Sequence, residues 1–125
     1  MHEMGIIVHL AKTLDKLAED NGLSRIGSVT VQVGEVSGIM TDLFTDAWEY
    51  FTRKSPILYG SELRLETIPA VTYCDGCGKN YETVKYGRTC PHCGSTETWL
   101  VQGNECIIKE IEAETPDETR GTEDA

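Results

Sequence analysis

Two short cysteine motifs decide how this sequence folds: Cys74-Asp75-Gly76-Cys77-Gly78 and Cys90-Pro91-His92-Cys93-Gly94. Each is a Cys-x-x-Cys-Gly knuckle, in which the chain must turn tightly so that both sulfurs converge on one ion. The glycine after the second cysteine supplies the permissive backbone angle that such a turn often needs. Two knuckles complete a tetrahedral shell of four sulfurs. The sequence therefore predicts a structural zinc site whose ligands are Cys74, Cys77, Cys90 and Cys93.

Disulfides, a redox dithiol and an iron site are the alternatives to zinc. Disulfides are uncommon in a cytoplasmic chain, and a redox Cys-x-x-Cys does not need a second copy followed by the same glycine. Iron stays open, because four thiolates also bind iron and zinc is only the commoner occupant. A module of about 34 residues is too small to fold by burial alone, so metal binding is expected to supply much of its folding free energy.

Three other residues with metal-binding or reactive side chains have simpler interpretations. His92 lies inside the second knuckle, where it is expected to be a turn residue, with an accessory metal contact as the alternative. Cys106 lies on a strand pattern, where a small buried hydrophobe is expected. His9 lies on the polar flank of the first helix and is expected to be solvated.

Outward from the cysteines, apolar residues at spacings of three and four predict two helices. The first begins near Met4 and ends before Gly22, a natural C-terminal stop. Thr41 or Asp42 is expected to cap the second, which ends at Ser55-Pro56. The apolar positions are Met4, Ile7, Val8, Ala11, Leu14, Leu17 and Ala18 in the first helix and Leu43, Phe44, Ala47, Trp48 and Phe51 in the second. The three aromatic residues are expected to pack in the core.

Three segments with alternating apolar and polar residues predict strands over 26–36, 61–68 and 106–112. In the first, Val29, Val31 and Val33 fall on one face, and Ser28, Thr30 and Gln32 fall on the other, which predicts one wet face. The cysteine-rich stretch lies between the other two strands, which can pair in one sheet. The predicted fold class is α+β: a small three-stranded sheet with two helices, plus an inserted tetracysteine zinc-ribbon-like module.

The predicted domain organisation follows from this insertion. Residues 1–70 and 105–113 form an α/β domain, and residues 71–104 form a zinc-binding domain. Residues 114–125 carry five acidic side chains, one basic side chain and no large apolar residue. Such a segment cannot offset its ordering entropy by burial, so a disordered acidic tail is expected.

Charge and composition narrow the class of protein. The formal net charge is −10, which argues against a partner held through phosphates, so no nucleic-acid binding is expected. No apolar run approaches the roughly 20 residues that cross a bilayer, and the first residues lack a secretory signal. A cytoplasmic protein is expected. Glycine-rich nucleotide loops, a nucleophile elbow and an open metal triad are absent from the sequence, so we expect no enzyme.

The N-terminus offers a second set of metal donors. Histidine at position 2 is expected to protect Met1 from removal, which leaves the amine of Met1, the backbone amides of His2 and Glu3, and the His2 imidazole close together. Nitrogen-rich, square-planar donor sets favour Ni²⁺ or Cu²⁺. Taken alone this is a weak signal, since most histidines at position 2 are simply exposed.

In combination, Met1-His2-Glu3-Met4 at the start of a helix, the α/β body and the two knuckles resemble the hydrogenase nickel-incorporation proteins of the HypA/HybF family. The resemblance covers residues 1 to about 113 and includes order, spacing and length. It implies a nickel metallochaperone that helps to insert Ni²⁺ into the large subunit of nickel–iron hydrogenase together with a nickel-handling GTPase. It also implies urease maturation factors as further partners.

The resemblance assigns roles to particular residues. His2 matches the family's nickel ligand, with the amine of Met1 and the neighbouring amides beside it, and Glu3 matches a residue that contributes to the nickel site. The domain formed by residues 1–70 and 105–113 is then the nickel-binding domain. The four cysteines match the family's zinc ligands. The alternative function is a zinc-ribbon adaptor that mediates protein or nucleic-acid interaction.

Overall fold

A computed structural model of the chain describes residues 3–116, which form two compact units. The first unit is built from residues 3–31, 39–64 and 108–116, and the second from residues 32–38 and 65–107. Met1, His2 and residues 117–125 of the predicted tail lie outside the described residues. The predicted start of that tail at residue 114 is wrong, because Glu114 is the last residue of a strand and its carbonyl accepts a hydrogen bond from Ser24 N.

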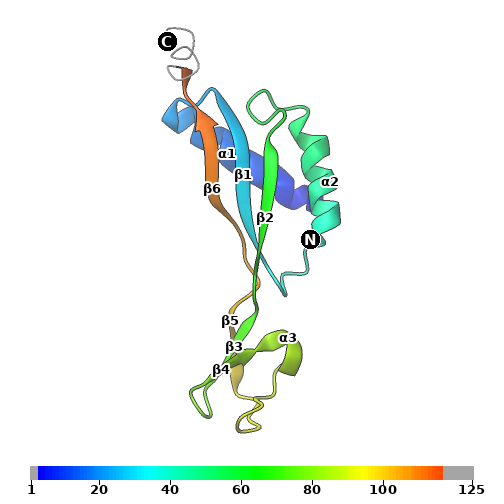
Figure 1. Cartoon of the computed structure of the whole chain (residues 1–125), viewed down its shortest axis with the longest axis vertical. Helices are drawn as coiled ribbons and strands as arrows, with labels where there is room; N and C mark the ends of the chain where they lie inside the picture. Colours follow the sequence, from blue (N-terminus) through cyan, green and yellow to red (C-terminus); the bar gives the residue numbers. More distant parts are fainter. Residues whose placement is uncertain (1–2, 117–125) are drawn as a thin grey trace. The chain divides into compact units, whose positions relative to one another are not determined.

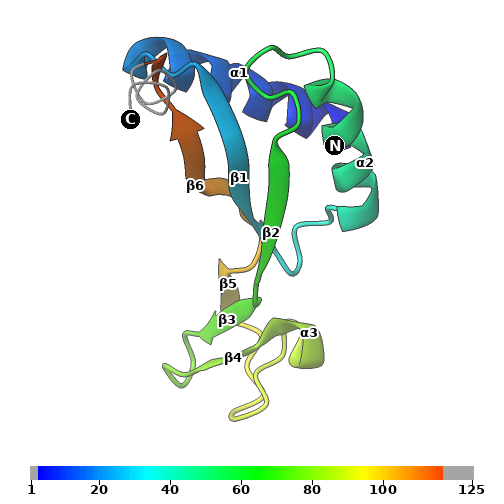
Figure 2. The ribbon, with the colours of Figure 1, turned by 45° about the horizontal axis from the view of Figure 1, so that its top comes forward.

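Two amphipathic helices supply most of the first unit's core. Helix α1 spans Glu3–Asn21, and four members of the predicted stripe are buried: Ile7, Ala11, Leu14 and Ala18. Met4 and Leu17, at the ends of that stripe, are exposed, and Leu10, which the prediction omitted, is buried. Helix α2 spans Thr41–Thr52 and buries Phe44 and Trp48, as expected, whereas Phe51 is half-buried and Leu43 is exposed. Both helices lie on one side of the sheet (Figures 1 and 2). Among residues 3–116, none of the helices combines the length and apolar character that crossing a membrane would require.

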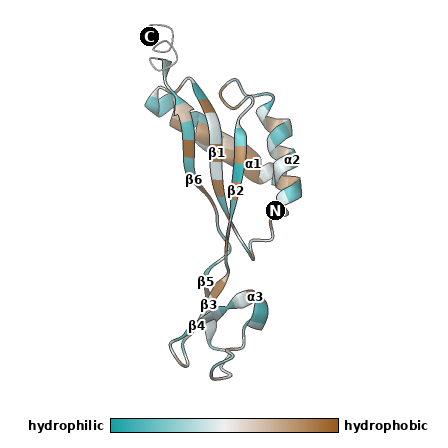
Figure 3. Ribbon diagram, in the orientation of Figure 1, coloured by the Kyte–Doolittle hydropathy of each residue, from teal (hydrophilic) through white to brown (hydrophobic). Residues whose placement is uncertain are grey.

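The larger sheet has three strands in the order β2-β1-β6. Strand β1 spans Arg25–Gly34, β2 spans Glu62–Ile68 and β6 spans Cys106–Glu114. The three predicted strands are therefore present, and apolar and polar residues alternate along β6 in Figure 3. The strands on either side of the cysteine-rich stretch share this sheet, but β1 separates them, so they do not pair with each other.

The predicted wet face of β1 is wrong for two of its three residues. Ser28 and Thr30 are 3% and 4% exposed, as deeply buried as the valines between them. On the neighbouring strands, Arg64 of β2 forms an ion pair with Glu112 of β6. Ser28 hydrogen-bonds Glu112, so this pair contacts the polar side of the central strand.

The start of α2 also differs from the sequence expectation. Its N-cap residue is Met40, and no side chain caps it in the way predicted for Thr41 or Asp42. The carboxylate of Glu3 instead accepts a hydrogen bond from the backbone N–H of Met40, with 3.0 Å between Oε2 and N. This contact ties the start of α1 to the start of α2.

The second unit contains a smaller antiparallel sheet in the order β4-β3-β5. Its elements are β3 (Val71–Cys74), β4 (Asn80–Glu82), the short helix α3 (Thr83–Tyr86) and β5 (Thr98–Gln102). The two cysteine knuckles follow β3 and α3, so this sheet and its turns position all four sulfurs.

Candidate metal centre

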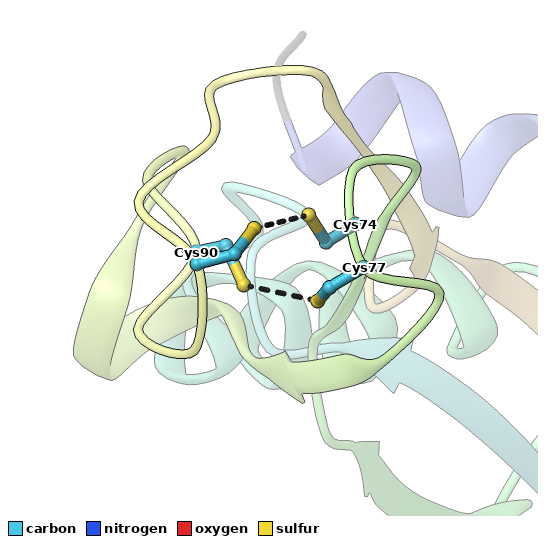
Figure 4. A group of neighbouring side chains, drawn as sticks. Cys74, Cys77 and Cys90 are labelled. Carbon is cyan, nitrogen blue, oxygen red and sulfur yellow. Dashed lines mark hydrogen bonds between the residues drawn. The ribbon is translucent and has the colours of Figure 1, made fainter.

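Four cysteine sulfurs converge in the second unit. The Sγ atoms of Cys74, Cys77, Cys90 and Cys93 all lie within 4.8 Å of one another. The Sγ of Cys74 is 3.5 Å from that of Cys93, and the Sγ of Cys77 is 3.7 Å from that of Cys90. Figure 4 shows Cys74 and Cys77 facing Cys90, which comes from a separate segment of the chain. Each knuckle therefore contributes two sulfurs to one cluster.

The two knuckles have the same backbone hydrogen bonds. In the first, Gly78 N donates to Cys74 O at 2.8 Å and Cys74 N donates to Lys79 O at 2.9 Å. In the second, the N–H groups at the equivalent positions, Gly94 and Cys90, donate at 2.9 Å to Cys90 O and Ser95 O. Gly78 and Gly94 have φ angles of 72° and 76°, which residues with a side chain rarely adopt. Both glycines therefore allow the tight turn of their knuckle, as predicted.

The donor set fits zinc. Four thiolates about 2.3 Å from a tetrahedral Zn²⁺ stand about 3.8 Å apart, close to the two sulfur separations given above. Cys74 and Cys90 are buried, Cys77 is half-buried and Cys93 is exposed, so one edge of the cluster faces solvent. Four protein ligands leave no coordination position for a substrate, so zinc here has a structural role. A zinc ion bound by these cysteines would hold β3 and the second knuckle together.

The shifted pKa values of the cysteine thiols also indicate that this cluster needs a cation. Desolvation raises the pKa of Cys90, but the backbone N–H groups of Cys93 and His92 and neighbouring thiols outweigh it and lower this pKa to about 7. For Cys93, the Ser95 backbone N–H lowers the pKa, while hydrogen bonds to other thiols and desolvation raise it to about 12. Four thiols in so small a volume cannot all ionise near neutral pH, and a divalent cation removes that conflict.

Tyr81 is a supporting residue that the sequence reasoning missed. It is 7% exposed and packs with Cys74 and Cys90 in the small core beside the sulfurs. Its hydroxyl donates a hydrogen bond to Gly87 O at 2.8 Å, which fixes the chain between α3 and the second knuckle. The signal that could have revealed it is an aromatic residue three positions after the glycine of the first knuckle, at the centre of a short strand.

The other candidate residues lie outside this cluster. His92 is exposed and donates its backbone N–H to the Cys90 sulfur at 3.3 Å, and its ring is not among the donors gathered within residues 3–116. Cys106 is half-buried on β6, and burial raises the pKa of its thiol, as expected for a small apolar residue. His9 is exposed on α1. Of the predicted nickel-site residues, only Glu3 lies within the described residues.

Comparison with known proteins identifies the family. The family model for hydrogenase/urease nickel incorporation, metallochaperone, hypA, matches residues 1–113. The chain belongs to this family. It is therefore a nickel metallochaperone of hydrogenase maturation, and its family consists of maturation factors rather than catalytic enzymes. That role implies interaction with the hydrogenase maturation machinery.

Individual relatives agree over nearly the whole chain. A hydrogenase maturation factor HypA of Geobacter metallireducens is 34% identical over 114 residues, which are 91% of this chain and 100% of the relative. A hydrogenase maturation factor HybF of Klebsiella pneumoniae is 26% identical over the same shares. The solution structure of the Ni metallochaperone HypA from Helicobacter pylori has a TM-score of 0.73 and 25% identity, and covers 92% of this chain and 99% of that chain.

Proposed function

We propose that this metallochaperone carries its nickel at the N-terminus, on the amine of Met1, the imidazole of His2 and the adjoining amide nitrogens, with Glu3 contributing to the site. The observation that carries the proposal is the family match, which begins at residue 1 and so includes these donors. Nitrogen donors in this arrangement suit Ni²⁺. The cysteine cluster is a poor alternative carrier, because a closed shell of four thiolates holds its ion too firmly for cargo that must be released.

The decisive experiment is a Ni²⁺ titration of the zinc-loaded chain by calorimetry. The native chain, His2→Gln, whose large second residue keeps Met1 in place, and a chain extended by a few residues before Met1 are compared. We expect both changes to weaken nickel binding by about tenfold or more, since each removes a nitrogen donor. Equal binding by all three chains would exclude the N-terminal site.

His9→Ala is the matched control for that titration. His9 is an exposed histidine on α1, seven positions after His2 in the sequence, so His9→Ala removes one histidine and leaves the proposed donors in place. We expect nickel binding to stay at the native level. Zinc content should stay near one ion per chain in every variant, because the four-cysteine shell is separate.

The partners we propose are the hydrogenase large subunit, which receives nickel, and a nickel-handling GTPase. Urease maturation factors form a second proposed set, and the family description, which includes urease, supports it. We place the protein in the cytoplasm, where thiols stay reduced and available for zinc. Co-purification tests these partners. We expect the chain to be recovered together with the hydrogenase precursor and the GTPase, and we expect this recovery to be lost in cells that lack either partner.

We also propose that the chain is not an enzyme. The cysteine cluster is closed to substrates, and the family consists of maturation factors. We further propose the domain division predicted above, with nickel held by one domain and zinc by residues 71–104. A zinc-ribbon adaptor without nickel function is the competing hypothesis. It predicts that His2→Gln leaves hydrogenase activity in cells unchanged, whereas nickel delivery predicts that this activity is lost.

A further inference from the structure

The outer strand of the small sheet has an exposed aromatic and apolar face. Trp99 and Val101 alternate with half-buried neighbours along β5, and their exposed fractions are 55% and 54%. Tyr73, the residue opposite Trp99 on β3, stacks beside it with 5.1 Å between ring centroids. A large apolar patch on a surface marks an interaction site, and Trp and Tyr are enriched at the centres of protein interfaces.

The same strand forms an edge of its sheet. In the order β4-β3-β5, β5 pairs with β3 on one side, and no strand within residues 3–116 pairs with its other side. Natural edge strands are protected by lysine, proline or an inward-pointing charge. The residues of β5, Thr98 to Gln102, include none of these. An extended peptide can therefore add to this edge through backbone hydrogen bonds.

A cavity beside β5 can receive side chains of such a peptide. It has a volume of about 300 Å³ and is lined by Val36, Leu100 and Trp99, among other residues of the second unit. Leu100 alternates with Trp99 and Val101 along the strand. An added strand whose side chains alternate in the same way would place one set beside Trp99 and Val101 and the other beside Leu100.

The negative charge of the second unit indicates what kind of partner this edge would bind. The second unit has six acidic side chains and three basic ones, and zinc with four thiolates adds two further negative charges. The three basic residues all fall between positions 79 and 88, and only Arg88 lines the cavity. The stretch from Thr89 to Ile108, which contains β5, has two glutamates and no lysine or arginine. A second copy of this chain or a nucleic acid would bring negative charge to negative charge.

We propose that the edge of β5, with Trp99 and Val101 on its exposed face, is a docking site for an extended basic segment of a protein partner, which adds to the sheet as a fourth strand. The partner segment has apolar side chains at alternate positions and lysine or arginine at its ends. The site goes beyond nickel carriage and does not depend on the N-terminal donors.

Two synthetic peptides test the proposal on the full, zinc-loaded chain without nickel. Both have about nine residues, with valine and tyrosine alternating with threonine; one has lysines at its ends and the other has glutamates. We expect the basic peptide to bind and to shift the backbone amide NMR signals of residues 98–102. We expect the acidic peptide to bind at least about tenfold more weakly. Failure of the basic peptide to bind, or equal binding of both, would overturn the proposal.

Matched variants locate the site. Val101→Lys places a charge on the edge strand and is expected to weaken binding of the basic peptide about tenfold or more. Val84→Lys adds the same charge on α3, at a side chain that is 64% exposed, and is expected to bind as the native chain does. Equal effects of the two substitutions would exclude the β5 edge. Zinc content is measured in both variants to show that the module is intact.

A second copy as the occupant is tested separately. Sedimentation velocity of the native chain and Val101→Lys is expected to show the same monomer mass. A dimer that Val101→Lys dissociates would overturn the proposal in favour of self-association. Because none of these measurements uses nickel, loss of peptide binding and loss of nickel binding are distinguishable outcomes.

Discussion

Arg64 on β2 and Glu112 on β6 form an ion pair across the intervening strand β1. Glu62 also pairs with Arg64, at 3.1 Å, so one guanidinium holds two carboxylates. Beneath them, Ser28 hydrogen-bonds Glu112, and Ser28 and Thr30 are shielded from water. The pair therefore links the two outer strands and covers the polar side of the central one.

The stabilising effect of this pair is expected to depend on pH. The hydrogen bond from Arg64, then that from Ser28, lowers the pKa of Glu112 from its ordinary value of 4.5. A lowered folded-state pKa stabilises the fold above the ordinary pKa, and this stabilisation is lost as pH falls through the folded-state value. Glu112→Gln should lower the urea midpoint of unfolding only slightly at pH 7, since the Arg64 and Glu112 side chains are 48% and 65% exposed. It should have no effect in strong acid, where Glu112 is protonated.

Glu110→Gln is the control for that measurement, because it removes the same charge two positions earlier on the same strand. Unfolding is followed by fluorescence of the buried Trp48 in the first unit. An equal loss at pH 7 in both variants would show that net charge, rather than the pair with Arg64, sets the stability.

Gly34→Ala is expected to destabilise the protein by about 3 kcal/mol, the upper end for overpacking. A Cβ at Gly34 would overlap the carbonyl group of Gly103, and that backbone is held by Val36 N, which donates to Gly103 O at 2.8 Å. Gly27→Ala is the control on the same strand, since its Cβ would meet Glu112 O at an ordinary 3.7 Å. The two variants are compared by thermal unfolding. Similar losses of stability would contradict the close approach of Gly34 to the Gly103 backbone.

Cys90→Ser is expected to lose zinc when the protein is dialysed against a chelator, because three thiolates no longer complete the shell. The sheet β4-β3-β5 should then lose order, as seen by the NMR signals of Tyr81. Cys106→Ser should keep its zinc, because Cys106 lies outside the sulfur cluster. Zinc loss from Cys106→Ser would mean that the ligand set is wrong.

Glu3→Ala is expected to lower stability by about 1 kcal/mol, because the Met40 N–H at the start of α2 loses its carboxylate acceptor. Urea unfolding of the nickel-free chain, followed by circular dichroism, measures the change. Glu19→Ala, an exposed glutamate on the same helix, is the control, with an expected change below about 0.5 kcal/mol. A result for Glu3→Ala as small as that would show that α2 does not need this contact.

Local patterns were enough to predict the helices and the metal cluster. Residues such as Ile7 and Leu14 recur at helical spacing because one face of α1 is buried, so the signal lies within neighbouring turns. The knuckle glycines Gly78 and Gly94 are required by turns that close over four residues. Convergence of the two knuckles follows from the preference of zinc for four sulfurs.

Contacts between residues far apart in the chain decided the rest. Ser28 hydrogen-bonds Glu112, which is 84 positions away and pairs with Arg64. The Met40 N–H at the start of α2 donates to Glu3, which is 37 positions from Met40. The edge position of β5 depends on which strand pairs with β3. The alternation of apolar and polar residues within a segment shows that its apolar face is buried. It carries no information about whether distant residues also cover the polar face. By itself, then, the sequence determined the two long helices, the three strands of the larger sheet and the four clustered cysteines. The tertiary structure alone decided the small sheet β4-β3-β5 with its exposed edge at β5, the burial on the second face of β1 and the contact at the start of α2.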